Sequence, residues 1–159
     1  MQKHLINNNI KIRILDSNIK KNSSFFLPQY ATPGSSGLDL RASIKKKISL
    51  PSKEVILVPT GIAIHIDNPY ITALVLPRSG LGHKNGIILG NLIGLIDSDY
   101  QGELMISLWN RSKNIFFINP YDRIAQMIFV PIIRPTFSIV DDFEETVRFG
   151  KGFGHSGVQ

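Results

Sequence analysis

The sequence contains no cysteine, which excludes disulfide bonds, thiolate zinc sites and iron–sulfur clusters. It also lacks a long hydrophobic run. The longest apolar stretch, 127–133, is interrupted by Pro131 and is far shorter than a membrane-spanning helix. The first residues contain no continuous apolar segment of the kind found in a signal peptide. These absences predict a cytoplasmic protein without a membrane anchor.

Two further absences narrow the possible chemistry. The four histidines, His4, His65, His83 and His155, are far apart, and none has metal-ligand spacing with another histidine or a glutamate. The sequence has neither the G-x-S-x-G pattern of a serine hydrolase nor the lysine of a Walker A motif. Hydrolases of the serine or P-loop type are therefore disfavoured.

The charge of the chain favours anionic partners. The formal net charge is +6 and the pI is about 9.7, so nucleic acid, anionic lipid and phosphorylated small molecules are all attracted. The basic residues are scattered apart from one run, Lys45–Lys47. We interpret this run as a solvated turn between strands rather than a nucleic-acid patch.

Short apolar segments separated by glycine, proline, asparagine and aspartate predict an all-β fold. Alternation with a period of two predicts half-buried strands at 10–14, 62–66 and 104–108. β-Branched and aromatic residues predict further strands at 71–76, 114–118, 124–133 and 137–140. One helical turn is predicted at 79–85, with Ser79 as its N-cap and Gly86 at its end.

The number and spacing of these strands are typical of a sandwich, jelly roll or barrel. The length of 159 residues, 43% of them hydrophobic, suits a single domain. We predict one β domain over residues 1–148 and a flexible, glycine-rich arm over 149–159.

Five segments are polar and glycine-rich where a plain β sandwich needs only turns. The first, 31–40, contains Asp39, which is either a turn carboxylate or a ligand, direct or through water, for a hard cation. The second, 77–84, places Arg78 and Ser79 at the start of the helical turn. Free backbone N–H groups and a guanidinium there would favour an anion, although a capped surface turn explains them equally well.

The third segment, 90–103, is interpreted as a β-hairpin that offers backbone groups and the Asn91 amide to a base edge. Asp97 follows an apolar strand, so we expect it to be partly buried and able to orient and deprotonate a water; the alternative is an ordinary turn. In the fourth segment, 122–126, a structural ion pair between Arg123 and a nearby carboxylate is the favoured interpretation.

The fifth segment, 148–157, is rich in glycine and therefore loses much backbone entropy when it becomes ordered. A ligand or partner would be needed to order it. Phe153 could stack on a base, while Arg148, Lys151 and Ser156 could hold phosphates. The alternative is a disordered tail.

Taken together and in this order, the five segments resemble the five motifs of the trimeric dUTPase family over residues 12–157, and bacterial members especially over 76–126. The resemblance implies a jelly-roll-like β-clip fold and a homotrimer whose active sites are shared between subunits and closed by the C-terminal arm. It implies hydrolysis of dUTP to dUMP and pyrophosphate with Mg²⁺. This activity keeps uracil out of DNA and supplies dUMP for thymidylate synthesis. Neither a membrane nor stable nucleic-acid binding is expected.

The resemblance also implies roles for individual residues. Asp97 would activate the attacking water and contact the sugar 3′-hydroxyl, and Asp39 would hold magnesium through water. Tyr100 would leave no room for a 2′-hydroxyl, and Phe153 would stack on uracil. The remaining substrate-binding residues would be Arg78, Ser79, Gly80, Gln126 and Arg148 for the phosphates, and Asn91, Leu95, Ile96 and Met105 for the nucleoside.

The chain departs from the family pattern at three positions: Phe149 and Lys151 replace arm glycines, and Tyr121 stands where glycine is common before the fourth motif. Two alternatives stay open. A dCTP deaminase shares the fold but needs another acid–base set, and the run 96–100 favours the hydrolase. Ammonia release from dCTP would identify it. A non-catalytic nucleotide or nucleic-acid binder suits the charge, and salt-dependent DNA binding would identify it.

Overall fold

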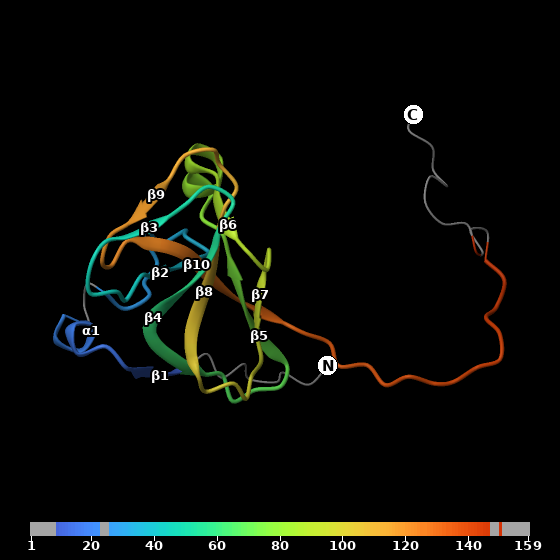
Figure 1. Cartoon of the computed structure of the whole chain (residues 1–159). Helices are drawn as coiled ribbons and strands as arrows, with labels where there is room; N and C mark the ends of the chain where they lie inside the picture. Colours follow the sequence, from blue (N-terminus) through green and yellow to red (C-terminus); the bar gives the residue numbers. More distant parts are fainter. Residues whose placement is uncertain (1–8, 23–25, 147–149, 151–159) are drawn as a thin grey trace.

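The computed structural model describes residues 9–22, 26–146 and 150 (Figure 1). This part of the chain contains ten β-strands, all paired antiparallel, and two short helical segments. Figure 1 shows the strands gathered into one body, from which the chain after the last strand runs outward in an extended path. The sequence-based prediction of an all-β fold is therefore confirmed.

The first sheet has four strands in the order β1-β4-β8-β6. They are β1 (Lys11–Ile14), β4 (Val55–His65), β8 (Glu103–Asn110) and β6 (Ile87–Leu89). In β8 the side chains of Leu104, Ile106 and Leu108 are buried while Met105 faces outward. The predicted alternation at 104–108 is thus a strand with one face in the core.

The second sheet has the order β2-β10-β5-β7, and a third sheet pairs β3 with β9. Their bounds are β2 (Leu38–Arg41), β10 (Arg123–Pro131), β5 (Ile71–Leu76), β7 (Gly94–Ile96), β3 (Ile48–Leu50) and β9 (Phe116–Ile118). In β10, Gln126 lies opposite Asp39 on one side and Leu76 on the other. This register brings the first, second and fourth polar segments to one place.

The core is almost entirely aliphatic and lies between the sheets. Val58 and Leu108 from the first sheet and Leu40 and Ala125 from the second are completely buried. Three polar residues of the described chain are also buried, Thr60, Thr72 and Asn110, of which Asn110 is the most buried. Its side chain is fully buried and makes four hydrogen bonds, two donated to the carbonyls of residues 50 and 114 and two accepted from residue 112.

Two short helical segments accompany the strands. Helix α1 (Ser17–Lys21) was not predicted; Asp16 caps it by accepting from the Asn18 backbone N–H at 2.7 Å, and Ile19 anchors it in the core. The π-helix η1 (Leu81–Asn85) lies within the predicted turn 79–85 and ends at Gly86, whose φ of 69° is left-handed. Ser79 is not the N-cap as predicted, because helical backbone already begins at that residue.

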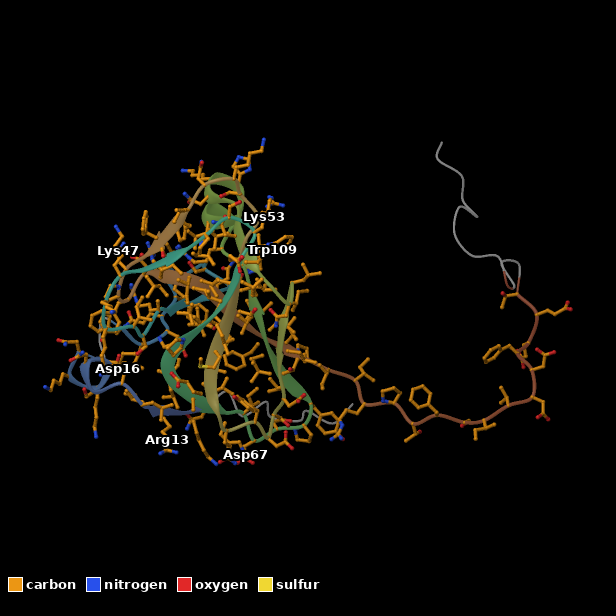
Figure 2. All side chains as sticks on the ribbon, in the orientation of Figure 1. Arg13, Asp16, Lys47, Lys53, Asp67 and Trp109 are labelled. Atoms are coloured by element: carbon orange, nitrogen blue, oxygen red, sulfur yellow. The ribbon has the colours of Figure 1, made fainter. Side chains whose placement is uncertain are left out.

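Two predictions of secondary structure are wrong. Residues 137–140 form no strand, and Phe137 and Ile139 are 94% and 100% exposed. Their β propensity finds no partner strand in the single chain. Figure 2 shows the segment after β10 running away from the β body with its side chains clear of it. Residues 90–103 do not form a hairpin, because β7 pairs with β5 in one sheet and β8 pairs with β4 and β6 in the other.

The basic run Lys45–Lys47 is an exposed connection between β2 and β3, as predicted. The Lys47 ammonium lies 4.1 Å from the centre of the Phe117 ring, so it also shields an exposed aromatic face (Figure 2). Among the described residues, no helix has the length and apolar character needed to cross a membrane.

Candidate active site

A polar cavity of about 290 Å³ lies where β2, β10 and the end of β5 meet. We call it the cradle. It is lined by Ala31, Ser35, Ser36, Gly37, Asp39, Arg78, Ser79, Gly80, Arg123 and Gln126. The fold thus brings the first, second and fourth polar segments together, including five residues predicted from the sequence: Asp39, Arg78, Ser79, Gly80 and Gln126.

One carboxylate organises the charged side of the cradle. Asp39 accepts from Arg78 Nε through Oδ1 at 2.8 Å and from Arg123 Nη1 through Oδ2 at 3.2 Å. The side chains of Asp39, Arg78 and Arg123 are 20%, 28% and 46% exposed. The predicted ion pair between Arg123 and a carboxylate is therefore confirmed. The three charges sum to +1, so the cradle attracts anions.

A third arginine adds to the positive charge. Arg41 lies two residues after Asp39 on β2 and opposite Arg123 in the sheet. Burial, followed by the neighbouring charge of Arg123, lowers the pKa of the Arg41 guanidinium. Sequence reasoning did not single out Arg41. Its distance from Asp39 could have pointed to Arg41, because residues i and i+2 of a strand lie on the same face of the sheet.

Gln126 closes the inner side of the cradle. Its Nε2 donates to the carbonyl oxygen of Pro77 at 3.0 Å, which ties β10 to the segment that carries Arg78. Gly37 makes this possible, because a Cβ there would lie 2.5 Å from Gln126 Oε1. Ser79 and Gly80 are exposed at the mouth of the cradle. A ligand can therefore reach them from solvent.

A second group of predicted residues lies on and around β7 and β8. Leu95 and Ile96 belong to β7, an edge strand, and Asn91 is exposed in the turn before it. Asp97 directly follows β7 and is exposed, so the expected partial burial is wrong for the single chain. The prediction considered the apolar strand before Asp97 and not its place at the edge of a sheet.

Tyr100 and Met105 complete this second group. The Tyr100 hydroxyl donates to the Glu103 carbonyl oxygen at 2.9 Å. Its ring packs directly on Gly102, where any Cβ would overlap the phenol. Met105 is exposed on the outward face of β8. The side chain of Tyr100 is therefore held in one orientation.

The two groups are separate within one described chain. The second group, Asn91, Leu95, Ile96, Asp97, Tyr100 and Met105, contributes no residue to the cradle lining. Arg148, Lys151, Phe153 and Ser156, predicted to bind substrate from the arm, lie outside the described residues, as does Phe149. The cradle is also lined by Ser35, Ser36 and Gly37. Their segment, 31–40, was singled out from the sequence, but these three residues were given no individual role.

The antiparallel β body holds a carboxylate and two guanidiniums in a small polar cavity, which places it among β proteins whose site is suited to a compact anion such as a phosphorylated small molecule. Comparison with known proteins identifies its family. The sequence profile of the dUTPase family matches residues 23–157. The chain therefore belongs to the dUTPase family, whose members are dUTP diphosphatases. Its fold is the jelly-roll-like β-clip of that family.

Named relatives agree with this assignment. The chain is 68% identical over 150 residues to the deoxyuridine 5′-triphosphate nucleotidohydrolase of Buchnera aphidicola subsp. Acyrthosiphon pisum, which covers 94% of this chain and 96% of the relative. It is 58% identical over 150 residues to the Escherichia coli protein of the same name, covering 94% of this chain and 98% of that relative. The comparisons favour the hydrolase over the deaminase and non-catalytic alternatives.

Solved structures show the same fold. Staphylococcus bacteriophage 80alpha dUTPase with dUPNHPP has a TM-score of 0.80 at 25% identity, covering 95% of this chain and 99% of that chain. A mutant dUTPase from phage phi11 of S. aureus, described with a structural Mg(II) ion, has a TM-score of 0.74 at 23% identity. That alignment covers 87% of this chain and 100% of the phage chain.

Proposed function

We propose that the chain hydrolyses dUTP to dUMP and pyrophosphate through attack of water on the α-phosphate. The observation that carries the proposal is the cradle, in which one carboxylate orients two arginines in a cavity open to solvent. Family membership supports the choice of dUTP. The reaction would keep uracil out of DNA and supply dUMP for thymidylate synthesis.

The cradle would bind the phosphates. A guanidinium has five N–H donors, more than Asp39 accepts from either Arg78 or Arg123, so donors remain for phosphate oxygens. Ser79, Gly80 and Gln126 would add further polar contacts at the mouth and inner side. Phosphoryl chemistry depends mainly on positioning and charge neutralisation, which is what such a cavity provides.

The group around β7 would bind the nucleoside. Asn91 and the backbone at Leu95 and Ile96 would read the uracil edge, with Met105 against the nucleoside. Tyr100, held by its bond to the Glu103 carbonyl, would exclude a 2′-hydroxyl. The side chains of Leu95 and Met105 are apolar and exposed. This supports the proposal that a ligand or a neighbouring subunit covers the surface on which they lie.

Asp97 would hold and deprotonate the attacking water and contact the sugar 3′-hydroxyl. An exposed carboxylate at the end of a strand is able to accept a proton from a bound water once solvent is excluded around it. This role requires Asp97 to face the cradle of another chain, because the two groups are separate within one chain.

A homotrimer with shared sites would bring the two groups together. Apolar side chains that a neighbouring subunit would cover include Val55 and Leu57 on the outward face of β4. The extended segment 132–146 also carries exposed Ile133, Phe137 and Phe143. The glycine-rich arm, 149–159, would close each site with Phe153 on uracil and Arg148 near the terminal phosphate.

Mg²⁺ is the proposed cofactor, and the cradle residues fit it. Within the described residues, no three histidine, aspartate or glutamate side chains lie together as a metal site. Each Asp39 oxygen accepts one arginine N–H and keeps a second lone pair for a water. Asp39 would therefore hold the ion through water, which suits a cation that keeps several of its waters. When bound, the ion supplies positive charge to the phosphate oxygens.

The test is pyrophosphate release from dUTP, dTTP, dCTP and UTP, each with and without Mg²⁺. We expect magnesium-dependent release from dUTP alone. Asp97→Asn should lose about a hundredfold or more of turnover, the size of a general-base effect, while still binding dUTP. Asp99→Asn, an exposed carboxylate in the same turn, is the matched control and should retain activity. Turnover by Asp97→Asn close to that of the parent would remove Asp97 from the proposed role.

A further inference from the structure

The turn that leads into β10 contains a residue in an unusual conformation. Residues 119–122 join β9 to β10, and the Asp122 N–H donates to the Asn119 carbonyl at 3.2 Å. Tyr121 has a φ of 62°. Pro120 before it and the positive φ at the third position identify a type II turn, where glycine is the usual residue. A tyrosine side chain is strained there, so contacts elsewhere must stabilise it.

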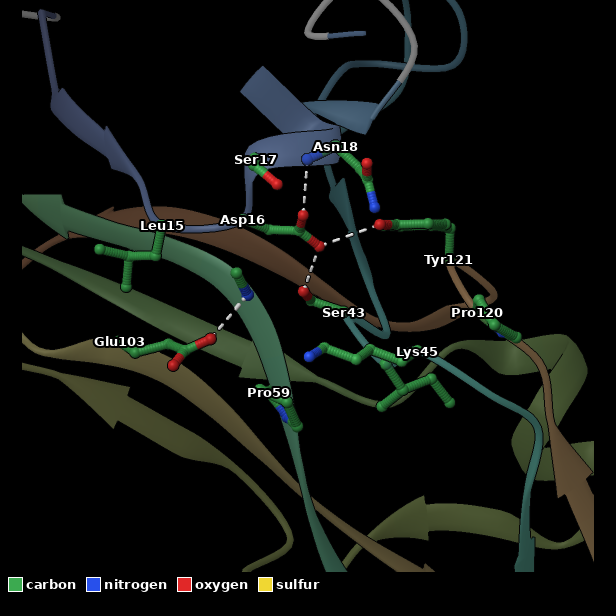
Figure 3. Close-up of a pocket in the computed structure, with 12 residues that line it drawn as sticks. Leu15, Asp16, Ser17, Asn18, Ser43, Lys45, Pro59, Glu103, Pro120 and Tyr121 are labelled. Carbon is green, nitrogen blue, oxygen red and sulfur yellow. Dashed lines mark hydrogen bonds between the residues drawn. The ribbon is translucent and has the colours of Figure 1, made fainter. Parts of the chain in front are cut away.

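Those contacts come from the N-terminal part of the chain. The Tyr121 hydroxyl donates to Asp16 Oδ2 at 3.0 Å (Figure 3). The Tyr121 and Phe26 ring centres lie 4.3 Å apart. The same Asp16 oxygen accepts from the Ser43 hydroxyl at 2.6 Å. Gly61 permits this approach, because a Cβ there would lie 2.8 Å from both Asp16 Cβ and Ser43 Oγ.

The backbone of Tyr121 faces the other way, toward the cradle. Its carbonyl oxygen accepts from Arg41 Nη1 at 3.0 Å, and its N–H donates to the Ala42 carbonyl at 2.8 Å. Two residues later Arg123 begins β10, opposite Arg41, and contacts Asp39. The backbone at residue 121 therefore contacts the Arg41 guanidinium directly and lies two residues before Arg123.

Tyr121 does not itself reach the cradle. Its side chain lines a different cavity of about 560 Å³, together with Asp16, Ser43, Lys45 and Glu103 (Figure 3). The two cavities share no lining residue. Any influence of the phenol on a ligand in the cradle must therefore pass through the backbone of the turn.

We propose that Tyr121 is a positioning residue for the phosphate-binding cradle, and that its phenol, held by Asp16, keeps the turn in the left-handed form that places Arg41 and Arg123. The inference rests on the proposed function and deepens it. Glycine adopts a positive φ without help, so a glycine at this position needs no contact with Asp16.

The experiment compares Tyr121→Phe, Tyr121→Ala and Tyr121→Gly. We expect Tyr121→Ala to raise both the KM for dUTP and the Kd for inorganic pyrophosphate by about three- to tenfold, comparable with the loss of one hydrogen bond. Tyr121→Phe should show a smaller rise, because the ring contact with Phe26 remains. Tyr121→Gly should bind as tightly as the parent although it melts at a lower temperature. If Tyr121 only stabilised the fold, the loss of binding in the three variants would increase in step with the fall in their melting temperatures.

A second arm tests the connection to Asp16. Asp16→Ala should raise KM in the parent and leave it unchanged in the Tyr121→Gly background, while its effect on the helix α1 cap is the same in both. Equal KM values in the parent and Tyr121→Ala, or an equal rise in Tyr121→Ala and Tyr121→Gly, would overturn the inference. If the proposed function is wrong, the parent protein itself will not hydrolyse dUTP. The pyrophosphate Kd, from calorimetry, ranks the variants even then.

Discussion

Replacing Asp39 by asparagine should change stability and anion binding in opposite directions. The carboxylate accepts from Arg78 at 2.8 Å and from Arg123 at 3.2 Å. Asparagine has nearly the same size but a single acceptor oxygen. Its amide nitrogen would face one of the guanidiniums, donor against donor. One hydrogen bond would be lost, and the other would join a charged guanidinium to a neutral amide oxygen instead of to a carboxylate.

The magnitude follows from the exposure of each partner. A hydrogen bond to a mostly shielded charged group contributes about 1.5–3 kcal/mol, and part of the Arg78 contact survives in Asp39→Asn. Arg123 is 46% exposed, so solvent reduces its contact to below about 1 kcal/mol. We expect the free energy of unfolding to fall by about 1–2 kcal/mol in total.

The substitution makes the cradle more positive, so anion binding should become tighter while stability falls. Arg78, Arg123 and Asp39 sum to +1, and the substitution makes the sum +2. Removing a unit negative charge a few ångströms from a phosphate in a nearly aqueous setting should tighten metal-free pyrophosphate binding about three- to tenfold. Magnesium-dependent turnover of dUTP should fall at the same time, because the carboxylate proposed to hold the ion is gone.

Urea unfolding, calorimetric titration with pyrophosphate in EDTA, and turnover across a magnesium series measure the three effects. Asp67→Asn is the matched control. It makes the same change in net charge by removing the exposed ion pair with Lys11 at 2.7 Å, and should leave stability nearly unchanged because solvent screens that pair. Weaker metal-free pyrophosphate binding by Asp39→Asn would refute the electrostatic reasoning and leave Asp39 a purely structural role.

Three further predictions concern other parts of the molecule. Asn110→Ala removes the four hydrogen bonds of a buried side chain and should lower the free energy of unfolding by about 3 kcal/mol with KM unchanged; a loss below about 1 kcal/mol in urea unfolding would contradict this. Gly102→Ala should displace Tyr100 and raise the kcat/KM for UTP relative to dUTP; an unchanged ratio would separate Tyr100 from sugar discrimination. Burial raises the pKa of Asp16, but its hydrogen bonds together outweigh burial and leave the pKa below 3.8. Its stabilisation should be complete above that pH and disappear as the pH falls through the folded pKa, so the stability of Asp16→Asn should approach that of the parent only in acid.

The strands with a strong local pattern could be predicted from the sequence. The segment 71–76 is β5 as predicted, because β-branched residues dominate it. Helix α1 was missed because five residues are too few to show helical periodicity, although Asp16 before Ser17 and Asn18 was an available capping signal. The three-residue strands β3 and β6 were missed for the same reason of length.

The cradle could not be assembled from local patterns. Asp39, Arg78 and Arg123 come from segments that are far apart in the chain, and their meeting depends on the register of β2 and β5 against β10. From the residues alone we predicted a possible cation ligand at Asp39, a possible anion site at Arg78 and Ser79, and an ion pair between Arg123 and some carboxylate, but not that these residues meet. The resemblance to known motifs supplied the rest. The expected burial of Asp97 failed because sheet order, which makes β7 an edge strand, is not readable from one strand.

The left-handed tyrosine before β10 also limits the order in which this sequence can change. Its conformation depends on an aspartate 105 residues earlier in the chain. A lineage that acquires tyrosine at position 121 before an acceptor is present at position 16 would carry the strain without its compensation. Once both are in place, neither is readily replaced alone. Sequences with glycine at position 121 should therefore need the residue at position 16 only for the helix α1 cap and the contact with Ser43, whereas those with tyrosine should also keep an acceptor there for the phenol.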